Sequence, residues 1–398
     1  MQITKINPIL LFLIAFAFME PLYAQEQSKD SIEIAFRPYT SLRGHTAIYN
    51  NKMELQENAS RIGAEIKIKK ETIAFIAGVE VQVNLFHGNT SFSADGGLTG
   101  GYQNVQSVQT KQVFGNRLGY LGLDLNKFGT ITIGKQWSVY RDITAYTDRF
   151  SVFGARASAT FIGGTDGGEN GTGRADQSII YRNQIGSFRF GGQIQARGQN
   201  NTSFVDGFGL SAQLEIASDF FIGAAFNKAY VSENLINSGT IVGLNGQPIY
   251  MAIGSKFIGS KVDFSIVGVL QKNGDFTQGN YTDLQGNTIT PTIVFDAKGL
   301  EIFGKYKFSK LAILAGYNHY APITSHIPIL NGQLPVERGF KRNDFIAGIT
   351  YQPVPFVQFY SEQRISTGSI ASGIRENSVF TLGMKIDLAT DFKKKFGL

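Results

Sequence analysis

The residue types that most often carry out chemistry in proteins are scarce in this sequence, and they are not spaced for it. There is no cysteine, and the four histidines, His45, His87, His319 and His326, have no fixed spacing between them. Zinc sites usually need closely placed ligands, so no metal is expected. The acidic, glycine-rich stretch 166–170 lacks the ligand spacing of a known calcium loop. No nucleophile lies in a recognisable strand-to-helix elbow, so we expect neither an enzyme nor a cofactor.

Charged side chains instead alternate with apolar ones along much of the chain. In segment 61–69, apolar side chains occupy the even positions, and charged ones, beginning with Arg61, occupy most of the odd positions. Segments 188–197, 210–216 and 380–388 repeat this period of two. Successive side chains of a β-strand point to opposite faces, so each segment is predicted to be a strand with one apolar and one polar face.

The composition and the connections between these segments favour a membrane barrel over a soluble sandwich. The chain has 32 Phe, 16 Tyr and 46 Gly, as expected for many strands joined by many turns. The strand-like segments run to about 9–13 residues, which suits a tilted strand that crosses a bilayer. Short connections alternate with long ones, as in outer-membrane barrels. The net charge of +6 is modest and spread out, so no nucleic-acid partner is expected.

The predicted fold is all-β: a transmembrane, antiparallel, up-and-down β-barrel of roughly sixteen strands, an even number as bacterial barrels require. Eight strands would leave an interior filled by side chains, whereas about sixteen leave a water-filled one. The predicted strands are 31–42, 58–69, 72–86, 112–126, 128–138, 177–184, 187–199, 207–217, 219–230, 248–258, 261–272, 295–308, 310–319, 340–352, 355–365 and 376–388.

The two ends of the chain are predicted to lie outside the barrel. Lys5 precedes an unbroken apolar run at 9–19, which is too short to span a bilayer and is followed by Leu22-Tyr23-Ala24. This layout predicts a signal peptide over 1–24, cut before Gln25. The barrel is then expected over 25–388. The segment 389–398, which carries three consecutive lysines, is interpreted as a basic C-terminal tail.

Part of the sequence resembles the general diffusion porins of Gram-negative outer membranes, which are trimers of 16-stranded barrels. The resemblance is clearest over 58–199 and rests on the order and spacing of several motifs. They are Ser60-Arg61-Ile62-Gly63, Asn116–Leu123, Phe128–Gln136, Tyr140–Asp148, Phe153-Gly154, Gly173-Arg174 and Tyr181-Arg182-Asn183. The stretch from Tyr140 is similar to the family's third loop, which folds into the barrel and narrows it.

The resemblance implies a homotrimer in outer-membrane lipid, each pore narrowed by a loop at about 139–176. By matching to the family, basic residues of the constriction wall correspond to Arg37, Arg61, Arg117 and Arg174, and loop positions correspond to Asp148, Val152 and Arg156. Arg37 and Arg61 also lie on the polar faces of their segments. The alternative is that these arginines are ordinary rim or lumen charges. Val152 and Arg156 stand where the family has acids, which predicts a more basic constriction and a mild preference for anions.

The function expected from this reasoning is a channel for passive diffusion of small hydrophilic solutes and ions across the cell outer membrane. The alternatives are a porin specific for a phosphate or a sugar, an intrabarrel outer-membrane enzyme, and an adhesin or structural barrel. A specific porin would need a continuous aromatic or arginine track along the lumen, and no catalytic constellation supports the enzyme.

Overall fold

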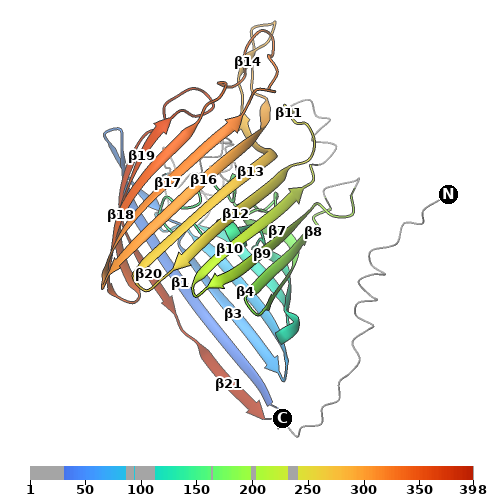
Figure 1. Ribbon diagram of the computed structural model, residues 1–398, viewed down its shortest axis with the longest axis vertical. Coiled ribbons are helices and arrows are strands. Elements are labelled where there is room, and N and C mark those ends of the chain that lie inside the picture. Colours follow the sequence, from blue (N-terminus) through green and yellow to red (C-terminus); the bar gives the residue numbers. More distant parts are fainter. Residues whose placement is uncertain are drawn as a thin grey trace, which may run out of the picture.

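Sixteen antiparallel strands pair edge to edge into a closed barrel (Figure 1). The computed structural model describes residues 31–86, 94, 113–162, 165–198, 203–231 and 241–397, so the predicted signal peptide lies outside the described residues. Each strand pairs with the next along the barrel, and β1 closes it by pairing with β20. The predicted fold class is confirmed, and each of the predicted ranges overlaps one strand of the barrel.

The barrel strands are β1 (Ser31–Tyr49), β3 (Arg61–Lys70), β4 (Ile73–Val83), β5 (Phe114–Asp124), β6 (Thr130–Trp137), β7 (Arg174–Ile185), β8 (Phe188–Gln195), β9 (Gly207–Ala217), β10 (Phe220–Ala229), β12 (Ile249–Ile258), β13 (Val262–Gln278), β16 (Thr292–Phe308), β17 (Leu311–Ile323), β18 (Arg342–Val354), β19 (Val357–Gly368) and β20 (Val379–Ala389). The remaining elements are β2 (Lys52–Glu57), β11 (Ile241–Val242), β14 (Tyr281–Thr282), β15 (Thr288–Ile289), β21 (Phe392–Gly397), the 3₁₀-helix η1 (Asn126–Phe128) and the helix α3 (Arg141–Thr144). In the described parts of the chain, no helix is long and apolar enough to cross a membrane.

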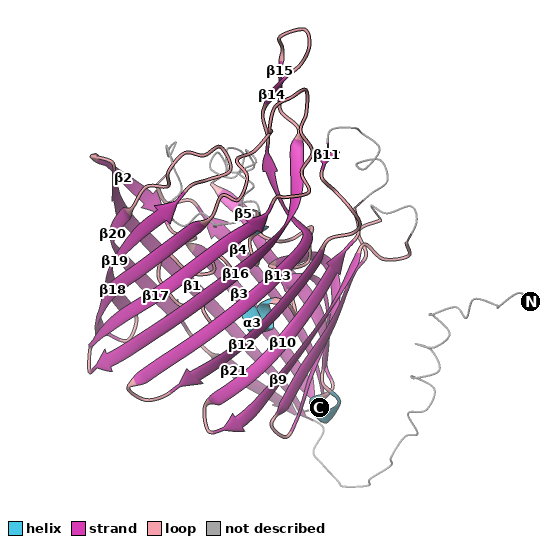
Figure 2. Cartoon of the chain, turned by 45° about the horizontal axis from the view of Figure 1, so that its top comes forward, coloured by secondary structure: helices cyan, strands magenta, loops and turns pink. Residues whose placement is uncertain are grey.

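The two ends of the barrel differ. One end carries tight turns, such as the two-residue turn between β9 and β10, and the other carries the long connections, including the β14–β15 hairpin that projects at the top of Figure 2. These are called the short-turn end and the long-loop end. The predicted alternation of short and long connections is therefore present.

Several strand boundaries differ from those expected, and two differences affect the arginines and the C-terminal segment. Strand β1 continues to Tyr49, because its last residues pair with β2 on one side and with β20 on the other. The expected tail 389–398 contains strand β21, which pairs with the first residues of β1 from Ser31↔Gly397 to Phe36↔Phe392. The chain thus continues to pair with β1 after a short break that follows Ala389.

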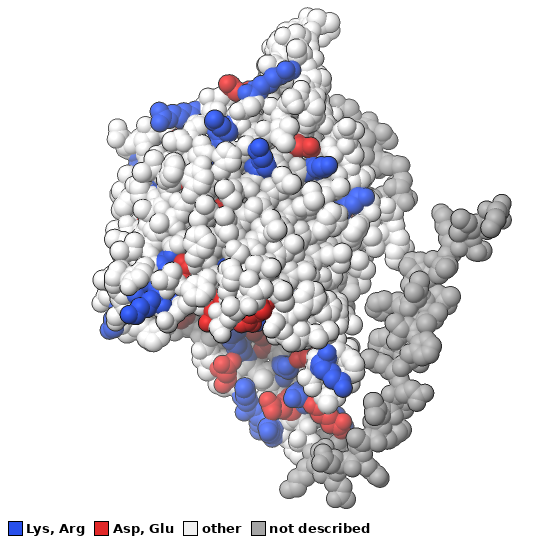
Figure 3. Space-filling model, in the orientation of Figure 1, with Lys and Arg blue, Asp and Glu red and all other residues white. Residues whose placement is uncertain are grey.

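The apolar side chains of the strands point outward and the polar ones point inward. In β17, the outward-facing Leu311 and Ile313 are 47% and 52% exposed, whereas the inward-facing Asn318 is 4% exposed. Carboxylates such as Glu301 and Glu362 are almost fully buried on the inward-facing positions. On the face shown in Figure 3, charged side chains gather toward the two ends and leave a nearly uncharged band between them. Such a band suits contact with lipid hydrocarbon.

Candidate functional site

Two of the predicted wall arginines meet at one buried carboxylate. Glu80 on β4 accepts a 2.6 Å hydrogen bond from Nε of Arg117 on β5, and Nε of Arg61 on β3 lies 3.5 Å from its other oxygen. The hydroxyl of Tyr39 on β1 also donates to Glu80, at 3.0 Å. Four neighbouring strands therefore hold two positive charges and one negative charge on their inward-facing side.

A β-bulge directs Arg117 inward. The register between β4 and β5 shifts between Glu80, which pairs with Leu118, and Val81, which pairs with Asn116. Arg117 is the extra residue, and it is only 6% exposed. Bulges re-aim side chains in this way. Simple alternation predicts that the side chains of Arg117 and Leu118 point to opposite faces of the sheet, whereas with the bulge both side chains are buried.

Arg174, at the start of β7, belongs to a second ion-pair group beside the first. Its Nε lies 3.4 Å from Asp166, which also receives a 2.7 Å contact from Lys135 of β6. Burial raises the pKa of Asp166, but the charges of Arg174 and Lys135 lower it by more, so the pKa lies below its usual range. Arg174 also experiences the field of Arg117, which places the two groups side by side.

Arg43, and not Arg37, joins this basic wall. Arg43 on β1 experiences the charges of Arg117 and of Asp148, the acid predicted on the opposing loop. Arg37 lies nearer the short-turn end, where it pairs with Glu65 at 3.3 Å and with Asp391 at 3.7 Å. The structure thus brings together Arg43, Arg61, Arg117 and Arg174, which we call the arginine wall.

Residues 138–173, which connect β6 to β7, form a long segment that we call the β6–β7 loop. Its first part packs on strands next to it: α3 contacts β9, β10 and β12. Tyr140, Ile143 and Tyr146 join inward-facing residues of β10, β12 and β13, including Ala225 and Val267, in one buried apolar cluster. This packing fills the space between the loop and those strands.

The loop then reaches strands far away in the sequence through two buried carboxylates. Glu301 of β16 accepts hydrogen bonds from the Thr147 hydroxyl and from the main-chain N–H of Ala157, the latter at 2.6 Å. Glu362 of β19 accepts from the main-chain N–H groups of Ser151 at 2.6 Å and of Val152 at 3.0 Å. Val152 therefore contributes its backbone to the anchor, and its side chain is 4% exposed.

Close approach of the loop to β16 requires glycine at one position. A Cβ atom on Gly299 would collide with the carbonyl oxygen of Ala157 in the loop. On the same strand, a Cβ atom on Gly304 would meet only the carbonyl oxygen of Ala315, at 3.9 Å, which is an ordinary contact. The missing side chain of Gly299 therefore lets the loop lie directly on β16.

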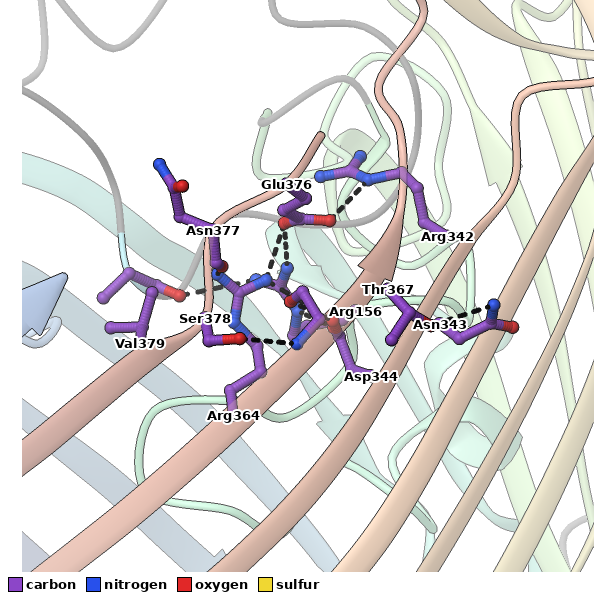
Figure 4. A network of polar contacts seen from close by, with 12 residues as sticks. Arg156, Arg342, Asn343, Asp344, Arg364, Thr367, Glu376, Asn377, Ser378 and Val379 are labelled. Atoms are coloured by element: carbon purple, nitrogen blue, oxygen red, sulfur yellow. Dashed lines mark hydrogen bonds and ion pairs between the residues drawn. The ribbon is translucent and has the colours of Figure 1, made fainter. Parts of the chain in front are cut away.

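Arg156, near the middle of the loop, lies in a buried ion-pair network (Figure 4). Its Nε lies 2.8 Å from Asp344 of β18, and its guanidinium also lies 3.0 Å from Glu376, in the connection between β19 and β20. Arg364 approaches the same two carboxylates at 3.5 and 2.6 Å, and Arg342 lies 2.8 Å from Glu376. Arg156 is 1% exposed, so it does not present a free cation to solvent.

The network holds the Glu376 carboxyl in its ionised form. Burial raises the pKa of Glu376, but the charges of Arg156, Arg342 and Arg364 lower it by more, to well below its usual range. The network therefore ties the loop, β18, β19 and a long-loop connection together through charge-assisted hydrogen bonds.

Asp148, the predicted acid of the loop, forms an ion pair within the loop. Its carboxylate lies 3.1 Å from Arg141 of α3 and is 23% exposed. Trp137 lies beneath two of these cations, with its ring centroid 3.7 Å from Arg141 and 5.5 Å from Arg174. Within the described residues, no group of His, Asp and Glu side chains is arranged to hold a metal ion.

The sequence reasoning missed Arg43 and the carboxylates that hold the loop and the wall. A signal was present for the carboxylates. Glu80, Glu301 and Glu362 are acids inside predicted membrane strands. An ionisable side chain within the membrane costs free energy unless it faces the interior and pairs with another group, so each acid indicates a partner inside the barrel. Arg43 shares its parity with Arg37, but it follows residue 42, where the first strand is predicted to end.

Comparison with known proteins decides the family. A model of the Gram-negative porin family matches residues 49–360. The chain belongs to this family. The resemblance to the general diffusion porins is therefore confirmed, and this porin is an outer-membrane β-barrel.

Individual relatives are distant. Outer membrane porin F of Xenorhabdus nematophila is 24% identical over 213 residues, which cover 50% of this porin and 54% of the relative. Outer membrane porin F of Salmonella typhimurium is 26% identical over 204 residues, which cover 48% and 52%. The chain thus spans about half the length of the curated relatives that it matches.

The solved structures show the same fold. Salmonella typhi OmpF, solved in complex with daunomycin, superposes with a TM-score of 0.65 at 15% identity, covering 92% of this porin and 99% of that chain. An anion-selective porin from Comamonas acidovorans superposes with a TM-score of 0.60 at 12% identity, covering 89% and 100%.

Proposed function

We propose that this porin forms a water-filled channel through which small hydrophilic solutes and ions diffuse passively across the outer membrane. A barrel of sixteen strands is wide enough for an aqueous lumen, whereas one of eight strands is filled by its side chains. Polar, inward-facing residues line the interior, as water requires. The channel carries out transport without catalysis.

The β6–β7 loop folds into the lumen and narrows it. The observation that carries this proposal is the pair of anchors on Glu301 and Glu362, since both side chains occupy inward-facing positions of strands across the barrel from β6 and β7. With the first part of the loop packed on β9, β10 and β12, the open path lies between the loop and the arginine wall. Asp148 then faces Arg43 across the constriction.

The constriction is mildly anion-preferring. The support for this selectivity is the arginine wall itself, in which Arg61 and Arg117 share the single carboxylate Glu80. A row of arginines in a narrow pore favours anions. Arg156 does not add to this field, because its charge is taken up by Asp344 and Glu376.

The porin assembles as a homotrimer surrounded by outer-membrane lipid. A solved structure of OmpT from Vibrio cholerae, which covers 89% of this chain at 15% identity, is described as a trimer form. Closed rotational symmetry is the usual form of homo-oligomers. Light scattering on the detergent-solubilised protein should give the mass of three chains plus detergent, and the mass of one chain would contradict the trimer.

Reconstitution into a planar bilayer with a KCl gradient tests the selectivity. The reversal potential should have the sign of an anion-preferring channel. The variant Arg61→Gln should move it toward cations, whereas Arg37→Gln, at an arginine paired with Glu65 and outside the wall, should move it much less. A cation-preferring wild type, or equal effects of the two variants, would contradict the role of the wall.

A further inference from the structure

A second group of basic side chains lies inside the barrel, apart from the arginine wall. Arg189 of β8 and Lys256 of β12 occupy inward-facing positions close to the short-turn end, since the neighbouring Phe188 and Phe257 are exposed on the outer face. Phe221 of β10 lies between them. The Arg189 guanidinium and the Lys256 ammonium each lie 4.9 Å from the centre of its ring.

These two cations have no acidic partner of their own. Among the residues that the structure describes, neither Arg189 nor Lys256 forms an ion pair, and Nε of Arg189 has no hydrogen-bond partner. The acid that acts most on Lys256 is Asp142, but Asp142 already binds Arg182 at 3.0 Å. Two positive charges are therefore held near each other, and the fields of Arg189 and Arg149 both act on Lys256.

The β6–β7 loop forms one side of this site. The Tyr146 ring lies 4.3 Å from the Lys256 ammonium, and the Tyr146 hydroxyl donates a 2.8 Å hydrogen bond to Gln213 of β9. On the other flank, Arg149 of the loop and Lys307 of β16 share the single carboxylate of Asp263, at 3.1 and 2.8 Å. Positive charge therefore exceeds negative charge on this side of the loop as well.

We propose that Arg189 and Lys256 form a binding site for solutes that carry a phosphate group, on the short-turn side of the β6–β7 loop. The oxygens of a phosphate group can accept hydrogen bonds from the planar guanidinium of Arg189 and are attracted by the compact positive charge of Lys256. A doubly charged oxyanion also offsets the mutual repulsion of the two cations, which a singly charged chloride ion does less well. This proposal depends on the proposed channel function only because the solute must reach the site through the channel.

The test uses inorganic phosphate as the probe and the full-length porin in detergent. Phosphate binding is measured by broadening of the ³¹P resonance at constant ionic strength, so that no channel activity is needed. The double variant Arg189→Gln/Lys256→Gln should bind phosphate about tenfold more weakly or worse, because it removes both charged hydrogen-bond donors. Among the described residues, neither side chain takes part in a hydrogen-bond network of the barrel, so the variant should fold.

Lys228→Gln is the matched control. Lys228 lies on β10, the strand of Phe221, and its ammonium lies 5.0 Å from the Tyr230 ring, but it occupies an outward-facing position near the long-loop end. The control should bind phosphate as the wild type does. No saturable broadening by the wild type, equal broadening by the double variant, or an equal loss in the control would each overturn the proposal.

A bilayer measurement separates the failure of the site from the failure of the channel. Phosphate added to KCl should reduce the single-channel current of the wild type at low millimolar concentration, and it should do so less in the double variant. Current steps that phosphate affects equally in both proteins would overturn the site and leave the channel standing. Phosphate binding without any current steps would contradict the channel and leave the site standing.

Discussion

Replacing Arg156 by methionine removes the central cation of the buried network that holds the middle of the β6–β7 loop. The change leaves Asp344, which is 0% exposed, without its 2.8 Å partner. Removing one member of a buried ion pair generally costs about 3–5 kcal/mol, because the remaining charge stays buried and uncompensated. We expect Arg156→Met to lower the free energy of unfolding by about 3 kcal/mol, at the lower end of that range.

The lower end follows from the partners that remain. Asp344 keeps a 2.6 Å hydrogen bond from the Ser366 hydroxyl and a 3.5 Å contact with Arg364. Glu376 keeps Arg342 at 2.8 Å and Arg364 at 2.6 Å. The uncompensated charge therefore resides mainly on Asp344. Adding Asp344→Asn to Arg156→Met should recover about 1–2 kcal/mol, because contacting charges are coupled by energies of this size.

Urea unfolding in detergent micelles, followed by tryptophan fluorescence and circular dichroism, measures the two single variants and the double variant. If the loss of unfolding free energy in the double variant equals the sum of the losses in the two single variants, the two residues are not coupled and the reasoning is refuted. A loss of unfolding free energy of less than about 1 kcal/mol in Arg156→Met would contradict the claim that the variant leaves a buried, uncompensated charge on Asp344. Arg149→Met is the control on the same loop: its side chain is 26% exposed, and Asp263 retains Lys307, so we expect a loss of about 1 kcal/mol or less.

Three further results follow from the contacts of the loop and the wall. Glu80→Gln leaves two arginines without their shared carboxylate, so it should shift the reversal potential in a KCl gradient further toward anions and lower the free energy of unfolding by about 3 kcal/mol. Folding lowers the pKa of Glu376, so the ionised carboxylate contributes fully to stability at pH values above its ordinary pKa of about 4.3. This contribution declines as the pH falls below that value. The difference in urea midpoint between wild type and Glu376→Gln should therefore be constant from pH 7 to 5 and shrink toward pH 3. Gly299→Ala places a methyl group against the carbonyl of Ala157 and should cost about 1–3 kcal/mol in urea unfolding, whereas Gly304→Ala should cost less than half as much; equal costs would contradict the close approach of the loop.

The barrel was predictable from the sequence, because every strand repeats one physical requirement. Lipid on one side and water on the other impose a period of two, and the segments 61–69 and 380–388 both lie on strands of the barrel. The strand ends were less predictable. The segment after Leu42 looks like a loop in sequence, yet it extends β1 because β2 and β20 provide partners, and this extension brings Arg43 to the wall.

The candidate site was predictable in its residue types but not in its pairing. Arg61 and Arg117 do share a site, but the inward direction of Arg117 depends on a bulge that alternation does not reveal. Arg156 was expected to add positive charge to the constriction. Its carboxylate partners, Asp344 and Glu376, follow it by 188 and 220 positions, so only the closed barrel brings them together. The selectivity proposed for the pore therefore rests on the arginine wall and not on Arg156.

Single-channel recording in a planar bilayer tests the channel most directly. If the barrel encloses a water-filled path, purified protein should produce discrete current steps whose conductance rises in proportion to the KCl concentration. Closure of a trimer should occur in three equal steps at high voltage. A folded barrel that inserts into the bilayer and produces no steps at any KCl concentration would contradict the proposed function.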